Sequence, residues 1–212
     1  MKNLILIALL FQTAFLSAQE EKQLELVGRW TTDSLPQTFG GSVFNEIWGF
    51  KVNGAEYAVV GSTRGAHIIA LDDGDPHQLF RLDGAVNGSQ HVHRDYHTYK
   101  DYLYTVADQG FSSLQIFDLS ELPNKITTVY DSTYPIVNAH NIFIDTTSGH
   151  LYSCLGGLSI GGNRVSNDIS IFDLSNPEKP ELLLRDTEIP WWNFAGVHDV
   201  YVRNDTAYLN TQ

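Results

Sequence analysis

The chain has 212 residues, of which 42% are hydrophobic and 18% charged, an ordinary globular composition with enough residues for one sizeable core. Its 25 acidic and 13 basic residues give a formal net charge of −12, which argues against nucleic acid and anionic membranes as partners, because Lys and Arg must neutralise phosphates. Aromatic residues make up 12% of the chain and there are 17 glycines, which favours an all-β fold.

The first 18 residues have the pattern of a secretory signal peptide. Lys2 supplies a positive charge, residues 4–16 are almost wholly apolar, and Ser17-Ala18 are small residues before a polar segment. The apolar run is too short for a membrane anchor, which needs about 20 residues. We therefore expect cleavage after Ala18, a secreted or cell-surface protein with no transmembrane segment in its mature chain, and one domain over residues 19–212.

Internal repeats organise that domain. The sequence LQIFDLS at 114–120 matches ISIFDLS at 169–175, and a weaker copy lies at 67–73. In each copy, apolar residues end in an Asp-rich turn, which is typical of a strand and its following turn. Two strands are expected before each copy and one after it. The predicted strands are 45–48, 56–60, 67–73 and 76–80; 94–97, 102–106, 114–120 and 125–129; 140–143, 150–154, 169–175 and 180–184; and 198–201 with 206–209.

These modules recur about every 50 residues, which is near the period of propeller blades. The sequence therefore predicts an all-β fold, a β-propeller of four-stranded blades with three whole blades and a partial fourth. A closed ring needs at least four blades, so we expect the N-terminal part of a longer protein. Residues 156–167 are expected to form an inserted, flexible, glycine-rich loop. Residues 24–29 are expected to be an outer strand that completes the last blade, since propellers avoid open sheet edges.

The chain resembles the choice-of-anchor B family, secreted bacterial proteins with LVIVD-type β-propeller repeats. The resemblance spans residues 24–212 and rests on LVGRW at 26–30, NEIWG at 45–49, QIFDL at 115–119, NAHNI at 138–142, FDLSNP at 172–177 and HDV at 198–200. It implies a propeller fold and an extracellular address. It implies no particular activity.

The residues that open the first strand of each module are expected to converge on the propeller axis. One level holds Asn45, Arg94, His140 and His198, and the next holds Glu46, Asp95, Asn141 and Asp199. Imidazoles and carboxylates suit a divalent metal such as Ca or Zn in the central channel. The predicted ligands are Glu46, Asp95, His140, Asp199 and His198. Alternatively, these polar residues bond backbone groups and pin adjacent blades together.

Three other features are candidates for function. His91 and His93 alternate on one strand near His97, so they could present two metal ligands or form a solvated rim. Trp191 and Trp192 could stack on a sugar or pack between blades. Cys154 is the chain's one cysteine, and its apolar neighbours favour a buried, inert thiol.

The leading functional hypothesis is a secreted or cell-surface module that binds an extracellular protein or glycan, with its activity unassigned. The alternative is a metal-dependent hydrolase or lyase whose five predicted ligands meet in the channel. A propeller can support either, so the fold alone does not choose between them.

Overall fold

The computed structural model describes residues 25–72, 74–190, 192 and 196–211, and these form an all-β fold. The predicted signal peptide, residue 24 and Trp191 lie outside the described residues. The strands are β1 Phe44–Val52, β2 Ala55–Ser62, β3 Gly65–Ala70, β4 His77–Asp83, β5 Arg94–Tyr99, β6 Tyr102–Ala107, β7 Leu114–Asp118, β8 Thr127–Ser132, β9 Ile136–Asn138, β10 Asn141–Asp145, β11 His150–Ile160, β12 Asn163–Asp173, β13 Glu181–Arg185, β14 Val197–Arg203 and β15 Thr206–Thr211. A single 3-10 turn, Asp186–Glu188, is the one helical element in this part of the chain.

The strands form four separate sheets, each a simple antiparallel meander. The orders are β1-β2-β3-β4, β5-β6-β7-β8, β10-β11-β12-β13 with β9 also paired to β11, and β14-β15. Three four-stranded blades and the two-stranded start of a fourth were predicted, and the sheets agree with that prediction. Asp118 and Asp173 close their turns as expected, because each accepts a hydrogen bond from the backbone N–H of a serine two residues later.

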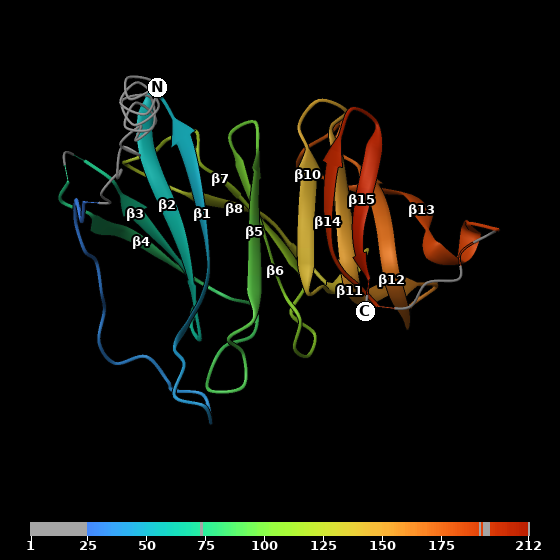
Figure 1. The fold of residues 1–212 in the computed structure, drawn as a ribbon, viewed down its shortest axis with the longest axis horizontal. Coiled ribbons are helices and arrows are strands. Elements are labelled where there is room, and N and C mark those ends of the chain that lie inside the picture. Colours follow the sequence, from blue (N-terminus) through green and yellow to red (C-terminus); the bar gives the residue numbers. More distant parts are fainter. Residues whose placement is uncertain (1–24, 73, 191, 193–195, 212) are drawn as a thin grey trace, which may run out of the picture.

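The first strands of the four blades, β1, β5, β10 and β14, lie next to one another along the middle of the molecule (Figure 1). The remaining strands of each blade follow outward from them. The segments containing Ile47, Ile142 and Val200 therefore face a shared centre, as the repeat predicts. This arrangement is that of propeller blades.

The glycine-rich segment 156–167 differs from its prediction as a flexible loop. It extends β11 and β12 into a long hairpin whose turn is Gly161-Gly162, and β9 pairs with its first strand. Glycine is needed there for close approach, since a Cβ on Gly156 would lie 2.1 Å from the carbonyl oxygen of Asn138. A single sequence does not distinguish a glycine required by close packing from a glycine in a flexible loop.

The predicted outer strand at 24–29 is wrong over its described residues. Residues 25–29 form no strand and are exposed. Gly28 instead lies against Gly74 and Pro76, in the connection between β3 and β4. This segment consequently contacts the first blade.

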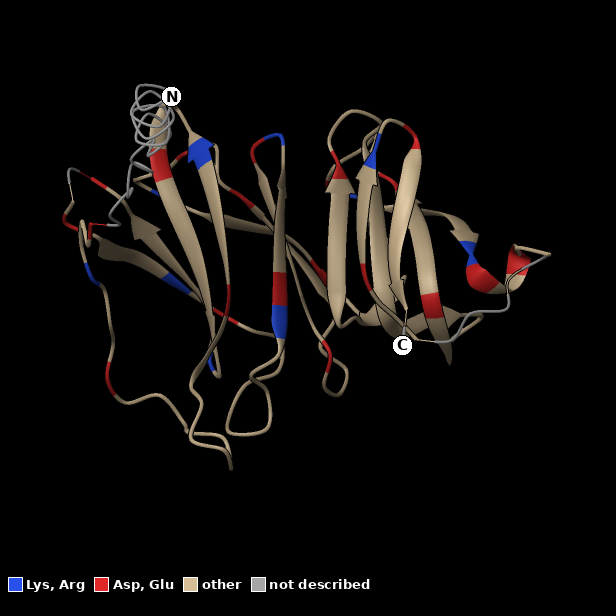
Figure 2. Cartoon of the chain, in the orientation of Figure 1, with Lys and Arg blue, Asp and Glu red and all other residues tan. Residues whose placement is uncertain are grey.

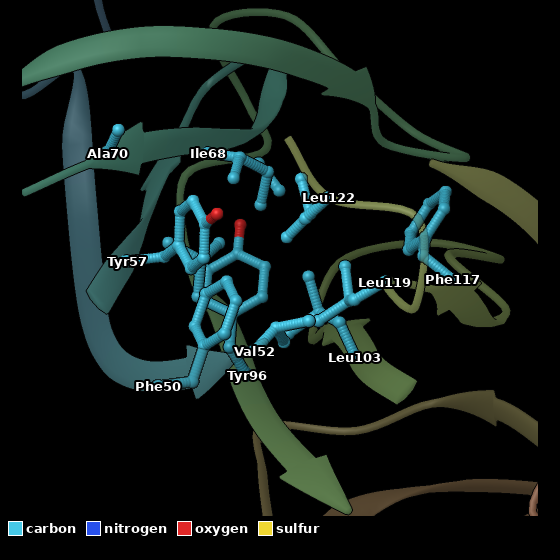
Figure 3. Packing of buried hydrophobic residues seen from close by; sticks show 12 residues of the cluster. Phe50, Val52, Tyr57, Ile68, Ala70, Tyr96, Leu103, Phe117, Leu119 and Leu122 are labelled. Atoms are coloured by element: carbon cyan, nitrogen blue, oxygen red, sulfur yellow. The ribbon is translucent and has the colours of Figure 1, made fainter. Parts of the chain in front are cut away.

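The hydrophobic core lies between neighbouring blades. In the first cluster, Phe50 and Tyr57 of the first blade point toward Tyr96 and Leu103 of the second (Figure 3). A second cluster joins the second and third blades, and a third joins the third and fourth. Because each blade buries its apolar face against the next, the stacking of blades fixes the positions of the first strands.

Acidic and basic residues are scattered along the described chain, many of them at strand ends and turns (Figure 2). Among the described residues, none belongs to a helix long and apolar enough to cross a membrane.

Candidate functional site

The first strands of the four blades line a small cavity of about 250 Å³ on the shared axis. Its walls carry three carboxyl groups, one amide and several aromatic rings. The polar members are Glu46, Asp95, Asn141 and Asp199, and the aromatic members include Trp48, His97, Phe143 and Tyr201. Each blade supplies one polar residue and, two positions later, one ring.

Glu46 enters the cavity from a β-bulge in β1. The pairing with β2 shifts between Asn45 and Ile47, so Glu46 is the extra residue, and its φ of 58° lies in the left-handed region. A non-glycine residue in that region is strained, and bulges often re-aim a side chain beside an active site. The backbone N–H of Ile47 donates to the Glu46 carboxylate at 3.0 Å.

Asp95 is the buried carboxyl group of the cavity. The backbone N–H groups of Tyr96 and Ile142 donate to its two oxygens at 2.8 and 2.6 Å, and Ile142 belongs to the next blade. Burial raises the pKa of Asp95 to about 8; the two N–H bonds oppose that shift, and the negative charges of Glu46 and Asp199 add to it. Asp95 therefore keeps its proton at neutral pH and also joins two blades.

Asp199 and Asn141 complete the polar ring. Asp199 is exposed on β14, and the backbone N–H of Val200 donates to its carboxylate at 2.7 Å. The alternative prediction, that polar residues at the start of these strands bond to the neighbouring blade, also holds for the residue before Glu46. The side-chain amide of Asn45 donates to the carbonyl oxygen of Arg94 at 2.9 Å. The polar positions thus include both cross-blade bonds and carboxylates open to the cavity.

The aromatic residues form a continuous belt across the four blades. Ring centroids are 4.0 Å apart for Trp48 and His97, 5.1 Å for His97 and Phe143, and 5.5 Å for Phe143 and Tyr201. Burial lowers the pKa of His97 to about 4, so its imidazole is neutral at pH 7. Sequence reasoning missed this belt, although a ring recurs two residues after each polar marker.

His140 and His198 meet beside this cavity rather than inside it. Their Nε2 atoms are 2.9 Å apart, and the Asp108 carboxylate lies 3.0 Å from Nδ1 of His140. The pairing of β14 with β15 shifts between Val197 and Asp199, so His198 is, like Glu46, the extra residue of a bulge.

The five predicted metal ligands therefore separate into two groups. Glu46, Asp95 and Asp199 line the cavity, whereas His140 and His198 contact each other. Over the described ranges, no three His, Cys, Asp or Glu side chains are arranged to hold one metal ion. Convergence of all five on one ion is not what the structure shows, and binding of a metal by fewer of them stays a prediction.

The structure places the remaining candidate residues, the other histidines, Trp192 and Cys154, at separate positions. His93 is exposed, and its ring centroid lies 6.2 Å from that of His140, while His97 is buried and is not part of a solvated rim. Trp192 is half-buried and packs against the core cluster between the third and fourth blades. Cys154 is fully buried, and burial raises the pKa of its thiol far above the usual range, as expected for an inert cysteine.

A larger hollow, about 610 Å³, shares no lining residue with this site. Val27 and Trp30 of the N-terminal segment and Phe44 and Ile47 of β1 line it together with other apolar residues. Since no titratable side chain lines this hollow, the smaller axial cavity is the better candidate for chemistry.

No protein-family profile and no curated protein matches the chain. Among solved structures, it is similar to a GH43 β-1,3-galactosidase bound to galactodeoxynojirimycin, with 9% identity over 65% of this chain and 44% of that chain, and a TM-score of 0.36. It is also similar to an exo-β-1,3-galactanase from Phanerochaete chrysosporium bound to β-1,3-galactotriose, with 12% identity over 65% of this chain and 34% of that chain, and a TM-score of 0.37. The chain spans less than half the length of either enzyme.

These comparisons correct the functional prediction. The predicted protein- or glycan-binding module has no counterpart among them, because both similar structures are named as enzymes, a galactosidase and a galactanase. Membership of the choice-of-anchor B family, secretion and a bound divalent metal stay predictions.

Proposed function

We propose that the axial cavity binds a carbohydrate and hydrolyses a glycosidic bond. One observation carries this proposal: three carboxyl groups from three blades surround one cavity, and burial raises the pKa of one of them, Asp95, to about 8. Glycoside hydrolysis uses such a pair of environments, because one carboxyl group must give a proton to the leaving oxygen while another acts as a carboxylate.

The belt of rings suits a sugar as ligand. Aromatic faces pack against the apolar C–H faces of a pyranose, and the polar residues beside them can hydrogen-bond its hydroxyl groups. Trp48 and Tyr201 supply such rings, and Asn141 supplies an amide. With about 250 Å³, the cavity lies just below the range of about 300–1,000 Å³ common for ligand sites, so we expect it to take one sugar unit at a time.

In this mechanism Asp95 is the proton donor. Its two backbone hydrogen bonds hold the carboxyl group in one orientation, and its burial keeps the proton available at neutral pH. Glu46 and Asp199 supply two further carboxylates. One attacks the anomeric carbon or activates a water molecule, and the negative charge of the other favours the oxocarbenium-like transition state. Each is held by the N–H of the following residue and is open to the cavity.

Hydrolysis of a panel of aryl glycosides and β-linked polysaccharides tests the proposal. Asp95→Asn, Glu46→Gln and Asp199→Asn are each expected to lower kcat/KM by at least about 10²-fold, the usual contribution of acid–base catalysis. Asp101→Asn is a matched control, because Asp101 is exposed at the turn between β5 and β6. Absence of cleavage across the panel, or equal activity in all four variants, would refute the proposal.

We further propose an extracellular place of action. This proposal is supported by the signal-peptide pattern of residues 1–18 and by the resemblance to a family of secreted propellers. A glycan at the cell surface or in the surroundings is then the expected substrate. Comparing the N-terminus of the protein recovered from culture medium with residue 19 tests this assignment directly.

A further inference from the structure

We infer that His140 and His198 bind one divalent transition-metal ion, such as Zn²⁺, that joins the third and fourth blades. The two histidines are 58 residues apart in the chain, and their Nε2 atoms lie 2.9 Å from each other. Two nitrogens that are each about 2.0–2.1 Å from a common ion stand about 2.9 Å apart at the 90° angle of a square-planar or tetragonal site. At the tetrahedral angle that Zn²⁺ usually adopts they stand about 3.3–3.4 Å apart, so Zn²⁺ would need the two rings to separate by about 0.4 Å. The site is separate from the proposed sugar cavity and does not depend on its activity.

The contact between the two imidazoles is bent, which departs from the geometry of a linear hydrogen bond. A hydrogen bond prefers a nearly linear N–H···N arrangement, which would place the centroids of His140 and His198 about 5 Å apart. Their centroids are 4.4 Å apart, with ring planes inclined at 62°. The two Nε2 atoms therefore approach at a bend, as they do when both lone pairs point toward one ion.

Asp108 prepares His140 for this role. A carboxylate can only accept a hydrogen bond, so the proton of a neutral His140 lies on Nδ1 and donates to Asp108 at 3.0 Å. Nε2 of His140 then carries a lone pair. Metal-binding histidines commonly have this carboxylate partner, which fixes the tautomer and makes the ligand more basic.

A third imidazole lies near the His140–His198 pair, and the pair is accessible to solvent. The His93 ring, at the start of the second blade, lies 6.2 Å from the His140 ring, and its side chain is exposed. The side chains of His140 and Asp108 are 23% and 22% exposed, so an ion can reach them. The other oxygen of Asp108 is buried and lacks a hydrogen-bond partner among the described residues, which is typical of a position beside an ion or water.

The ligand atoms, two imidazole nitrogens, determine which ions can bind. Imidazole nitrogens bind Zn²⁺, Ni²⁺ and Cu²⁺, whereas Ca²⁺ and Mg²⁺ require oxygen ligands. Of the two metals predicted from the sequence, this pair suits Zn²⁺. With His93 added, the ion would connect three blades, which otherwise meet here through side-chain packing and isolated hydrogen bonds.

Titration of Zn²⁺ into the chelator-treated protein, followed by calorimetry and metal analysis after gel filtration, tests the inference. The unaltered protein is expected to bind one Zn²⁺ per chain, while His140→Gln and His198→Gln lose at least about 100-fold in affinity. Asp108→Asn is expected to weaken binding by about 10- to 100-fold, the usual effect of removing a carboxylate that supports a ligand. His93→Ala is expected to weaken it as well.

His77→Ala is the matched control, because His77 is an exposed histidine whose Nδ1 lies 3.1 Å from the carbonyl oxygen of Asp75, away from the His140–His198 pair. Glutamine keeps the size and hydrogen-bonding capacity of histidine, and circular dichroism in metal-free buffer confirms that each variant folds. Binding in the unaltered protein that His140→Gln and His198→Gln leave intact, or that His77→Ala weakens equally, would overturn the inference. Unchanged affinity in His93→Ala would exclude the third ligand. Loss of glycoside cleavage with intact Zn²⁺ binding, or the reverse, separates this site from the sugar cavity.

Discussion

Replacing Asp95 by Asn tests whether this buried carboxyl group holds a proton in the folded protein. In the unfolded chain its pKa is close to 3.8, and in the folded protein it is raised to about 8. Between these two values the folded state binds a proton that the unfolded state has lost. Asp95 therefore contributes stability that is fully present below about pH 4 and disappears as the pH rises through about 8.

The magnitude follows from the difference in proton binding. While one proton separates the two states, the free energy of unfolding falls by about 1.4 kcal/mol for each pH unit. From pH 5 to pH 8 the wild-type protein should therefore lose on the order of 4 kcal/mol relative to Asp95→Asn, in which this titration is absent. The variant should be less stable at pH 5, because its amide can accept only one of the two N–H bonds from Tyr96 and Ile142, and an unmade buried bond costs about 1–3 kcal/mol.

Urea denaturation followed by tryptophan fluorescence at pH 5, 6, 7 and 8 measures both effects. Plotted against pH, the free energies of unfolding of the two proteins should converge or cross as the pH rises. The wild type loses stability as Asp95 gives up its proton, whereas the side-chain amide of the Asp95→Asn variant does not titrate. Parallel curves over the whole interval would refute the raised pKa. They would also remove the proton donor from the proposed hydrolysis.

Two further predictions concern the core. Leu151→Ala removes a fully buried side chain between the second and third blades and should cost about 2–5 kcal/mol in urea denaturation, whereas Leu183→Ala at a 52% exposed position should change stability by less than about 0.5 kcal/mol; similar losses would contradict the assigned packing. The Cys154 thiol should be unreactive toward a disulfide reagent in the native protein and react fully in urea, because it is buried and its pKa is raised; rapid native reaction would show that this blade opens.

The blade pattern was predictable because each strand carries its own local signal. The apolar run and the Asp-Leu-Ser turn recur at a fixed spacing, so one copy supports the next, as residues 114–120 and 169–175 illustrate. The hairpin at 156–167 was not predictable in the same way. Its glycines are required by the approach of Asn138 from β9, and that contact is visible only once the strands are paired.

The sequence predicted which residues lie near the shared axis, but not which of them lie together. The alignment of polar markers correctly brought Glu46, Asp95 and Asp199 to the axis and His140 to His198. The structure divides the five between two places, because successive residues of a strand point to different sides and His198 and Asp199 consequently serve different places. The bulges that set these directions depend on one extra residue in a strand, and a hydrophobic pattern does not reveal them.

The two proposed sites are linked through the backbone, although no side chain is shared between them. His140 directly precedes Asn141, and His198 directly precedes Asp199. An ion held by both histidines would fix the chain one residue away from two walls of the sugar cavity. Since the third and fourth blades otherwise meet through apolar packing and isolated hydrogen bonds, that ion would hold Asp199 at a more constant distance from Asp95. Zn²⁺ should then raise the affinity of the cavity for its sugar without touching it, and an effect on kcat alone would not fit this arrangement.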